Sequence, residues 1–376
     1  MRRTLTLGLA GLLLLLVIGV VVVSNRSSGG GKVVVVRGVI GSEKKPFFDD
    51  PRVKAAFRKA GFDVQVDTAG SRQIATSVDL SKYDFAFPAG TPQAQKIKSD
   101  HKAKTVYVPF STPMAIASFE PIVKILATAG VAKDEGGWYS FDMAKFLALV
   151  AADTRWSDLA GSADYPSNKQ VLITSTDVTT SNSAGMYASI ASYVLNGNNV
   201  VASSAQAQAV APVVAPLFGR QGYTEQSSEA PFDDYLSIGA GKTPIVMIYE
   251  SQFVARAVAK DGSIVPGMVL MYPTPTIVSK HSLVPLTDNG DKVGQLLMTD
   301  PTLQNLAVQF GFRTADPAAF AKVVKDAGIA TAPSLIDVVE PPTNDNLEAL
   351  IDAISESMKS TSVNTSTSVN STTVNT

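Results

Sequence analysis

The chain has 376 residues, of which 45% are hydrophobic and 17% are charged, and its formal net charge is −1. These values are typical of a folded globular protein with room for two domains. The small net charge gives no electrostatic reason to expect a nucleic-acid partner. The chain has no cysteine, which excludes disulfides, thiolate metal ligands, a cysteine nucleophile and a lipid-modified cysteine anchor.

An apolar segment, Thr4–Val23, follows Arg2 and Arg3 near the N-terminus. It is long enough to cross a bilayer as a helix, and longer than the apolar stretch of about 7–15 residues in a cleaved signal. We therefore interpret residues 1–26 as a membrane anchor or signal segment, and favour an uncleaved transmembrane helix over a long cleaved signal. The two arginines predict that the body lies outside the cytoplasm. Residues 27–31, rich in Ser and Gly, are expected to be a linker.

At the other end, residues 359–376 are interpreted as a disordered tail, because Ser360–Thr376 contains only Ser, Thr, Asn and Val and has no apolar face. Asn364 and Asn370 match the glycosylation pattern, although a plain solvated tail is the favoured interpretation.

Between these ends, strand and helix patterns alternate. The first part predicts, in chain order, a buried strand at Lys32–Val36, a helix at Asp50–Ala60, a strand at Phe62–Val66, a helix at Arg72–Ser77, a strand at Tyr83–Phe87, a helix from Pro92 and a long extended stretch at Thr105–Ser118. This order favours a parallel sheet with right-handed crossovers.

The same logic continues beyond residue 140. The predicted helices are Phe141–Ala151, Ser183–Leu195, Val200–Leu217, Gln304–Phe310 and Pro317–Ala327, and the predicted strands are Gln170–Thr174, Thr243–Tyr249, Met268–Tyr272 and Thr276–Leu286.

Several stretches together resemble the type II periplasmic-binding-protein family. Gly70–Ile74 is similar to the Gly-Ser-Ser-x-x-x-x-Gln-Ile region of molybdate-type proteins, with contracted spacing, and Asp177–Gly185 resembles the family's second-lobe motif, with Val178 in place of proline. Tyr107–Ala117 and Met271–His281 look like the two strands that cross between lobes, and Asp300–Thr314 looks like the family's late helix. The resemblance implies an α/β, two-lobed fold with two hinge-crossing strands, preceded here by an N-terminal transmembrane helix.

The resemblance also implies a domain division. Residues 32–112 and 273–358 are expected to form lobe 1, and residues 113–272 are expected to form lobe 2.

Ligands of open α/β sheets bind beyond the carboxyl ends of the strands, where helix N-termini present free N–H groups. Loops at such positions supply the candidate ligand-binding residues, which are Gly41, Ser42, Glu43, Ser71, Arg72, Ala89, Gly90, Thr91, Thr179, Thr180, Ser181, Asn182, Ser183, Tyr249 and Glu250. Each has a plainer alternative: the Ser and Thr residues can be simple helix caps, Arg72 a surface residue, and Tyr249 part of the core.

Two apparent motifs are set aside. Gly239–Thr243 resembles a phosphate-binding loop, but it lacks the first glycine of that motif and precedes a strand. His101 and His281, the only histidines, lie in separate segments without a third ligand nearby, so neither a zinc site nor another cofactor is predicted.

The sequence thus predicts an extracytoplasmic solute-binding protein for a small polar or anionic ligand, working with a membrane permease of an ABC-type transporter or as a surface sensor. A structural or adhesive surface protein and an enzyme built on the same fold are the alternatives. No nucleophile–base pair or metal-ligand cluster favours the enzyme.

Overall fold

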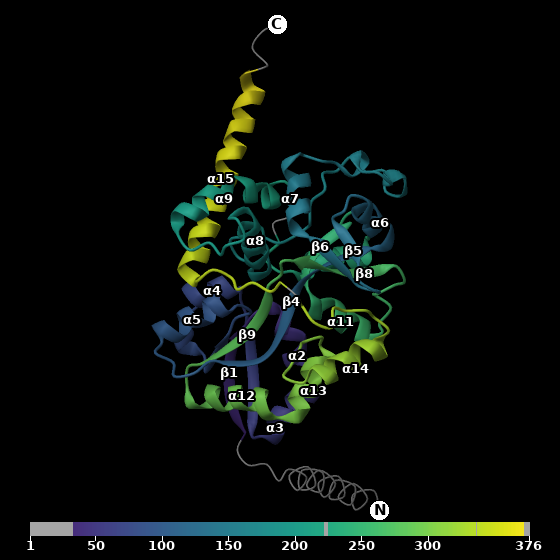
Figure 1. Ribbon diagram of the computed structural model, residues 1–376. Helices are drawn as coiled ribbons and strands as arrows, with labels where there is room; N and C mark the ends of the chain where they lie inside the picture. Colours follow the sequence, from purple (N-terminus) through teal and green to yellow (C-terminus); the bar gives the residue numbers. More distant parts are fainter. Residues whose placement is uncertain (1–32, 222–224, 336, 372–376) are drawn as a thin grey trace, which may run out of the picture.

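The computed structural model describes residues 33–221, 225–335 and 337–371, without the side chains of residues 361–371. The predicted anchor and linker (residues 1–26 and 27–31) lie outside these ranges. The described chain forms two lobes stacked end to end, with β1 starting at one pole and the C-terminal helix α15 leaving from the other (Figure 1). None of the helices in the described ranges is both long enough and apolar enough to cross a membrane.

Lobe 1 is a sheet of order β2-β1-β3-β9, in which β1 pairs in parallel with β2 and β3, and β9 is antiparallel to β3. Its strands are β1 (Val34–Ile40), β2 (Phe62–Thr68), β3 (Phe85–Phe87) and β9 (Val278–Pro285). Its helices are α2 (Lys45–Asp49), α3 (Pro51–Lys59), α4 (Ser71–Thr76), α5 (Thr91–Asp100), α12 (Asp288–Thr299), α13 (Pro301–Gln309) and α14 (Pro317–Ala327). Alternating residues of β1 face opposite ways, so Val36 and Ile40 pack into a phenylalanine-rich cluster and Val39 packs with α4 and α5.

Lobe 2 is built on the second half of β4 (Tyr107–Phe119), which pairs with β7 and β8, while β8 continues to β6 and β5. The other strands are β5 (Ala132–Asp134), β6 (Tyr139–Asp142), β7 (Ile245–Tyr249) and β8 (Met268–Thr274). The helices are α6 (Glu120–Thr128), α7 (Met143–Ala151), α8 (Asn182–Leu195), α9 (Ser204–Gly219), α10 (Glu229–Ser237) and α11 (Glu250–Ala259).

The strand β4 joins the lobes. Residues 107–113 pair with β9, and residues 114–119 pair with β7 and β8. The chain returns between β8 and β9. Both crossings lie where the sequence predicts them, in Tyr107–Ala117 and Met271–His281.

A third crossing was not predicted. After α14 the chain runs back beside Thr276, whose N–H donates to the Asp337 carbonyl while its own carbonyl accepts from Val339 N–H. It then forms α15 (Asn344–Ser371), which packs on α8 and α9 through Leu347, Leu350 and Ile354.

The crossing changes two predictions about the C-terminal part. Residues 344–358, which the sequence assigns to lobe 1, pack into the core of lobe 2, because their apolar stripe matches that of α9. The predicted disorder of residues 359–376 also differs from the structure, since α15 remains helical to Ser371; residues 372–376 are not described.

Other differences are local. Gln170–Thr174 is extended but forms isolated bridges instead of a strand. The helix expected at Phe141 begins at Met143, because Phe141 belongs to β6 and the Asp142 side chain caps the helix by accepting from Lys145 N–H.

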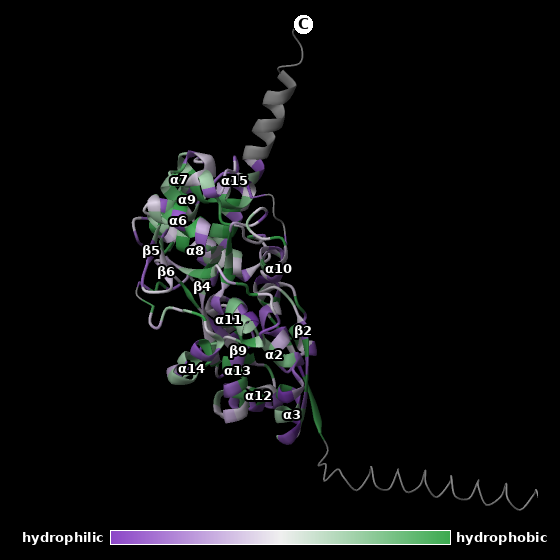
Figure 2. Cartoon of the chain, turned by 90° about the vertical axis from the view of Figure 1, so that its right-hand side faces the viewer, coloured by the Kyte–Doolittle hydropathy of each residue, from purple (hydrophilic) through white to green (hydrophobic). Residues whose placement is uncertain are grey.

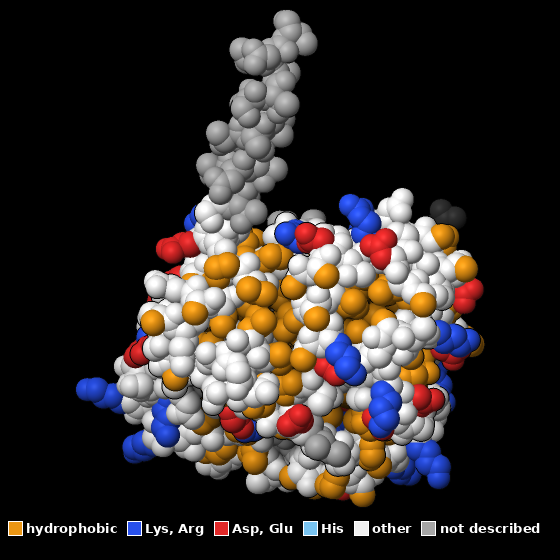
Figure 3. All heavy atoms as spheres, turned by 45° about the horizontal axis from the view of Figure 1, so that its top comes forward, with side chains coloured by type: hydrophobic (Ala, Val, Ile, Leu, Met, Phe, Trp, Pro, Cys, Tyr) orange, Lys and Arg blue, Asp and Glu red, His pale blue; other side chains and the backbone are white. Residues whose placement is uncertain are grey.

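Hydrophobic residues concentrate around α6 to α9 in lobe 2 (Figure 2). The face seen in Figure 3 carries scattered apolar side chains, with acidic and basic residues interspersed around its margin. No single-sign field covers this face, which is consistent with a net charge near zero.

Candidate functional site

A small chamber lies between the two lobes, with a volume of about 20 Å³. That is room for roughly one water molecule. Lobe 1 contributes Gly41, Ser42, Glu43, Ala69, Gly70 and Ser71, and lobe 2 contributes Ser181, Asn182, Ser183, Gln226, Ser227, Ser228 and Tyr249. Eight of these residues are among those singled out from the sequence.

Helix N-termini from both lobes converge on the chamber. Gly70 precedes α4, Ser181 precedes α8, Ser228 precedes α10 and Tyr249 precedes α11. The first N–H groups of a helix lack partners within the helix, and its dipole is positive at this end. These helix N-termini therefore favour an anionic or strongly accepting group in the chamber, against the opposing charge of Glu43, which also lines it.

Side-chain hydrogen bonds fix the walls of the chamber. Ser71 Oγ accepts from Ala89 N–H at 2.9 Å, and Ser183 Oγ lies 2.9 Å from Ser181 Oγ. Asn182 Nδ2 donates to Tyr249 OH at 2.9 Å, while Asn182 Oδ1 is buried without a hydrogen-bond partner in the described part of the chain. The wall thus retains an acceptor beside the helix N-termini.

The lobes touch directly around the chamber. Ser42 Oγ lies 3.2 Å from Ser227 Oγ. A Cβ atom added to Gly70 would lie only 2.5 Å from the Thr180 carbonyl oxygen. The structure is thus a closed arrangement, in which Gly70 permits a contact that a larger residue would block.

Arg72, a candidate ligand clamp, instead joins the lobes. Its guanidinium donates to the Thr179 carbonyl at 3.0 Å, to Glu348 at 2.6 Å and to Asp352 at 3.2 Å. It does not line the chamber, because these acceptors of lobe 2 and α15 occupy its donors.

Four further candidates do not line the chamber. The N–H of Ala89 is bonded to Ser71, and its carbonyl accepts from Ser279 Oγ at 2.5 Å. Gly90 lies against the Asn182 side chain. Thr91 lines a separate surface pocket with residues that precede α15, and Thr180 Oγ1 is buried without a hydrogen-bond partner among the described residues.

Glu43 belongs to a buried cluster with Lys44 and His281. Lys44 Nζ bonds Glu43 Oε1 and lies 3.1 Å from His281 Nδ1, which is 3.4 Å from the same carboxylate oxygen. His281 is enclosed by the rings of Phe87, Phe110, Tyr249 and Phe312. The sequence drew attention to Glu43, but gave no sign that Lys44 and His281 would join it.

Burial and charge set the protonation of this cluster. Burial opposes ionisation of Glu43, but the charge of Lys44 and the hydrogen bond with His281 outweigh it and hold the pKa of Glu43 well below its usual range. Burial, followed by the charge of Lys44, lowers the pKa of His281 to about 4. At neutral pH the cluster is therefore an ionised carboxylate beside a neutral imidazole.

Glu250, also a candidate, is fully buried away from the chamber. Its two oxygens accept from Arg313 at 2.6 and 2.7 Å, and one accepts from Tyr272 OH at 2.5 Å. Arg313 donates as well to the Ala332 carbonyl at 2.6 Å. The carboxylate is thus committed to a structural ion pair, and its prediction as a ligand contact is not supported by this position.

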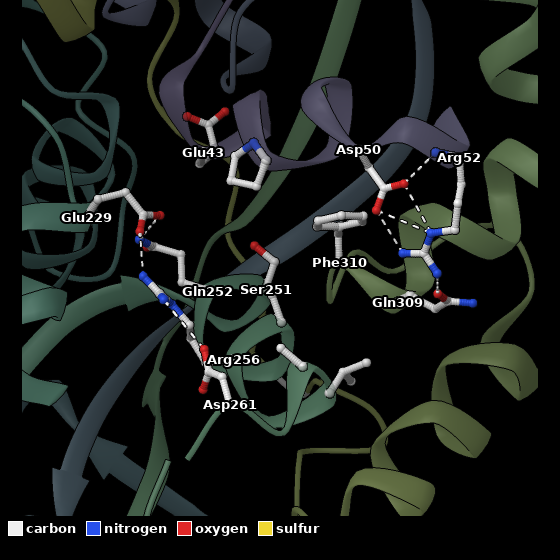
Figure 4. A pocket seen from close by; sticks show the side chains of 14 residues that line it. Glu43, Asp50, Arg52, Glu229, Ser251, Gln252, Arg256, Asp261, Gln309 and Phe310 are labelled. Atoms are coloured by element: carbon white, nitrogen blue, oxygen red, sulfur yellow. Dashed lines mark hydrogen bonds and ion pairs between the residues drawn. The ribbon is translucent and has the colours of Figure 1, made fainter. Parts of the chain in front are cut away.

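A second cavity, which we call the interlobe groove, has a volume of about 570 Å³. Its walls come from α2, the start of α3, α10, α11 and the end of α13 (Figure 4). Glu43 lines both the groove and the chamber. The sequence did not predict this groove, although serines before an acidic residue are common at helix starts, and Ser228 with Glu229 could have located α10.

The glycine-rich segment Gly239–Thr243, which resembled a phosphate-binding loop, leads into β7 in the structure. Its Lys242 forms an ion pair with Asp234 at 2.6 Å. Within the described ranges, no group of three or more His, Cys, Asp or Glu side chains is arranged to hold a metal ion.

No protein-family model matches the chain, and no curated protein does either. Solved structures do match. The periplasmic binding protein AfuA from Actinobacillus pleuropneumoniae, with fructose-6-phosphate bound, aligns over 88% of this chain and 99% of its own, with 10% identity and a TM-score of 0.55. The chain has the fold of the periplasmic binding proteins.

Two further structures agree. Iron-bound HitA from Pseudomonas aeruginosa aligns over 87% of this chain and 99% of its own, with 13% identity and a TM-score of 0.51. The apo ferric ion-binding protein A from Pasteurella haemolytica aligns over 86% of this chain and 96% of its own, with 10% identity and the same TM-score. These neighbours are binding proteins, and they do not single out the molybdate-type subgroup.

Proposed function

We propose that this protein is an extracytoplasmic solute-binding protein, which captures a small polar or anionic ligand in the chamber between its lobes. The observation that carries the proposal is the meeting of four helix N-termini and several serine hydroxyls at one interlobe point. Such a constellation stabilises negative charge without needing a basic side chain.

Ligand entry requires the lobes to separate, because the closed chamber holds about one water molecule. A ligand seated between the lobes would replace direct contacts such as Ser42–Ser227 and favour closure around itself. The candidate residues Gly41, Ser42, Glu43, Ser71, Ser181, Asn182, Ser183 and Tyr249 form the proposed site.

The cellular setting is part of the proposal. Thr4–Val23 has the length and apolarity of a membrane anchor, and an anchored receptor would deliver its ligand to an ABC-type permease or serve as a surface sensor. The fold neighbours are compatible with solute capture, since AfuA is a periplasmic binding protein and HitA is iron-bound.

The test is a thermal-shift and calorimetric screen of the full chain, purified in mild detergent, against phosphate, sulfate, molybdate, sugar phosphates and carboxylates. At least one of these anions should stabilise the protein, because a ligand that binds only the folded state raises its melting temperature. Absence of stabilisation across the panel would contradict the proposal.

A matched pair of glycine variants locates the site. Gly70→Ala places a methyl group against the Thr180 carbonyl and should weaken binding of the anion by about tenfold or more, since closure is obstructed. Gly241→Ala is the control, because an added Cβ meets nothing within 4 Å there. Equal affinities in the two variants would show that the ligand binds elsewhere.

A further inference from the structure

The interlobe groove is much larger than the chamber and borders it at Glu43. The groove has a volume of about 570 Å³ and the chamber about 20 Å³, and Glu43 lines both. Gln252 connects them as well, since its Oε1 accepts from Tyr249 N–H in the chamber wall and its Nε2 donates to Glu229 in the groove. The two cavities share the Glu43 side chain, so a ligand that reached from the chamber into the groove would have to pass beside it.

The basic side chains of the groove are occupied by protein partners. Arg52 donates to both oxygens of Asp50 and to Gln309 Oε1. Arg256 lies 2.9 Å from Asp233 and 3.8 Å from Asp261. The groove thus has little positive charge to offer a second anionic group.

Glu229 is the acidic group of the groove with the weakest compensation. It accepts one hydrogen bond from Gln252 at 2.8 Å, and Arg256 is 4.0 Å away. Burial raises the pKa of Glu229, and the charges of Asp233 and Glu43 raise it further, against the hydrogen bond from Gln252 and the charge of Arg256. A hydrogen-bond donor placed between Glu229 and Glu43 would relieve this repulsion.

The rest of the groove is mainly apolar, with Pro46, Ala255, Val258 and Phe310 on its walls, and Ser251 adds one hydroxyl. Figure 4 shows the Phe310 ring between the acidic side near Glu229 and the Arg52–Asp50 pair. Such walls suit a carbon skeleton.

We propose that the ligand is an organic anion in two parts: its anionic group occupies the chamber, and a carbon skeleton bearing hydroxyl or ammonium donors lies in the groove and donates to Glu229 and Glu43. This inference rests on the proposed function of the chamber. It excludes sulfate and molybdate as the preferred ligands, because neither has a carbon skeleton or, near neutral pH, a proton to donate.

The experiment is calorimetric titration of the full chain with glycerol 3-phosphate, O-phosphoethanolamine, ethyl phosphate and inorganic phosphate. Glycerol 3-phosphate and O-phosphoethanolamine share the phosphate ester but carry hydroxyl and ammonium donors, whereas ethyl phosphate carries neither on its carbon chain. At least one donor-bearing ester should bind about tenfold more tightly than ethyl phosphate, the usual effect of one hydrogen bond to a charged group. If glycerol 3-phosphate binds more tightly, the preferred donor is a hydroxyl; if O-phosphoethanolamine does, it is an ammonium group.

Glu229→Gln is the decisive variant, because it keeps the side-chain shape and removes the charge. It should reduce the preference for the donor-bearing ester over ethyl phosphate by about tenfold. Asp234→Asn, on the same helix but outside the groove lining, should leave the preference intact.

An unchanged preference in Glu229→Gln, or equal affinities for the donor-bearing esters and ethyl phosphate, would overturn the role of the groove. The proposed function would survive that result if phosphate or ethyl phosphate still bound and Gly70→Ala weakened the binding. Failure of every phosphate probe to bind would contradict this inference, and the anion panel would then decide the proposed function separately.

Discussion

Glu43 and Glu250 occupy equivalent places in the two lobes and have different surroundings. Each lies just beyond the carboxyl end of a strand, β1 or β7, and each side chain is almost completely enclosed. Both oxygens of Glu250 accept hydrogen bonds from Arg313, and one also accepts from the Tyr272 hydroxyl. In contrast, Lys44 and His281 both contact the same oxygen of Glu43. Glu43 also lines two cavities. The comparison shows that burial alone does not give a carboxylate a binding role; how fully its oxygens are satisfied matters more.

Breaking the Glu250 pair should have the largest effect on stability. Arg313→Met leaves a buried carboxylate without its cation and should lower the free energy of unfolding by about 3–5 kcal/mol, as measured by chemical denaturation. Arg256→Met, which removes a more exposed ion pair, should cost about 1 kcal/mol or less. Similar losses in the two variants would mean that the Glu250 pair is not specially important.

Lowering the pH should destabilise the protein through the buried cluster of Glu43, Lys44 and His281. Because the folded-state pKa of His281 is about 4, below its ordinary value near 6.5, the unfolded chain binds more protons between these values. The contribution of His281 to the free energy of unfolding should therefore be fully present above pH 6.5. It should fall as the pH drops toward 4, by up to about 3 kcal/mol.

His281→Asn retains a polar group but does not titrate, and it should flatten the pH dependence of unfolding between pH 4 and 6.5. His101→Asn, at an exposed position, should leave it unchanged. A slope in this interval that survives in His281→Asn would assign the effect to other groups.

The smallest effect concerns binding. Glu43→Gln removes negative charge from the chamber and should raise the affinity for sulfate several-fold, as measured by calorimetry. Glu250→Gln should leave sulfate affinity unchanged while lowering stability. If Glu250→Gln shifted sulfate affinity as much as Glu43→Gln, the contrast between the two carboxylates would be lost.

The sequence predicted much of this architecture because its signals are local. β-branched runs mark β1 and β7, and serine-rich loops mark the helix N-termini that meet at the chamber. Both crossings were predicted through their resemblance to a known arrangement.

What the sequence did not reveal depends on contacts between distant segments. Arg72 is a reasonable ligand clamp until α15 brings Glu348 and Asp352 to it. Nothing in the local sequence distinguishes Lys44 from its neighbour Lys45, yet Lys44 is fully buried against His281, more than 200 positions away. Local sequence patterns do not indicate contacts between segments that are far apart in the chain. The partners of Glu43 and the packing of α15 could therefore not be predicted.

The third crossing has a mechanical consequence. A body joined by two neighbouring connections can bend and also twist about them, whereas a third connection beside Thr276, continued by α15 and braced by Arg72, resists torsion. We therefore expect the relative motion of the lobes to be mainly bending. The described chain begins at the far pole of lobe 1 and ends on lobe 2 (Figure 1). If β1 were held in place, lobe 2 would be the lobe that moves, and α15 would move with it.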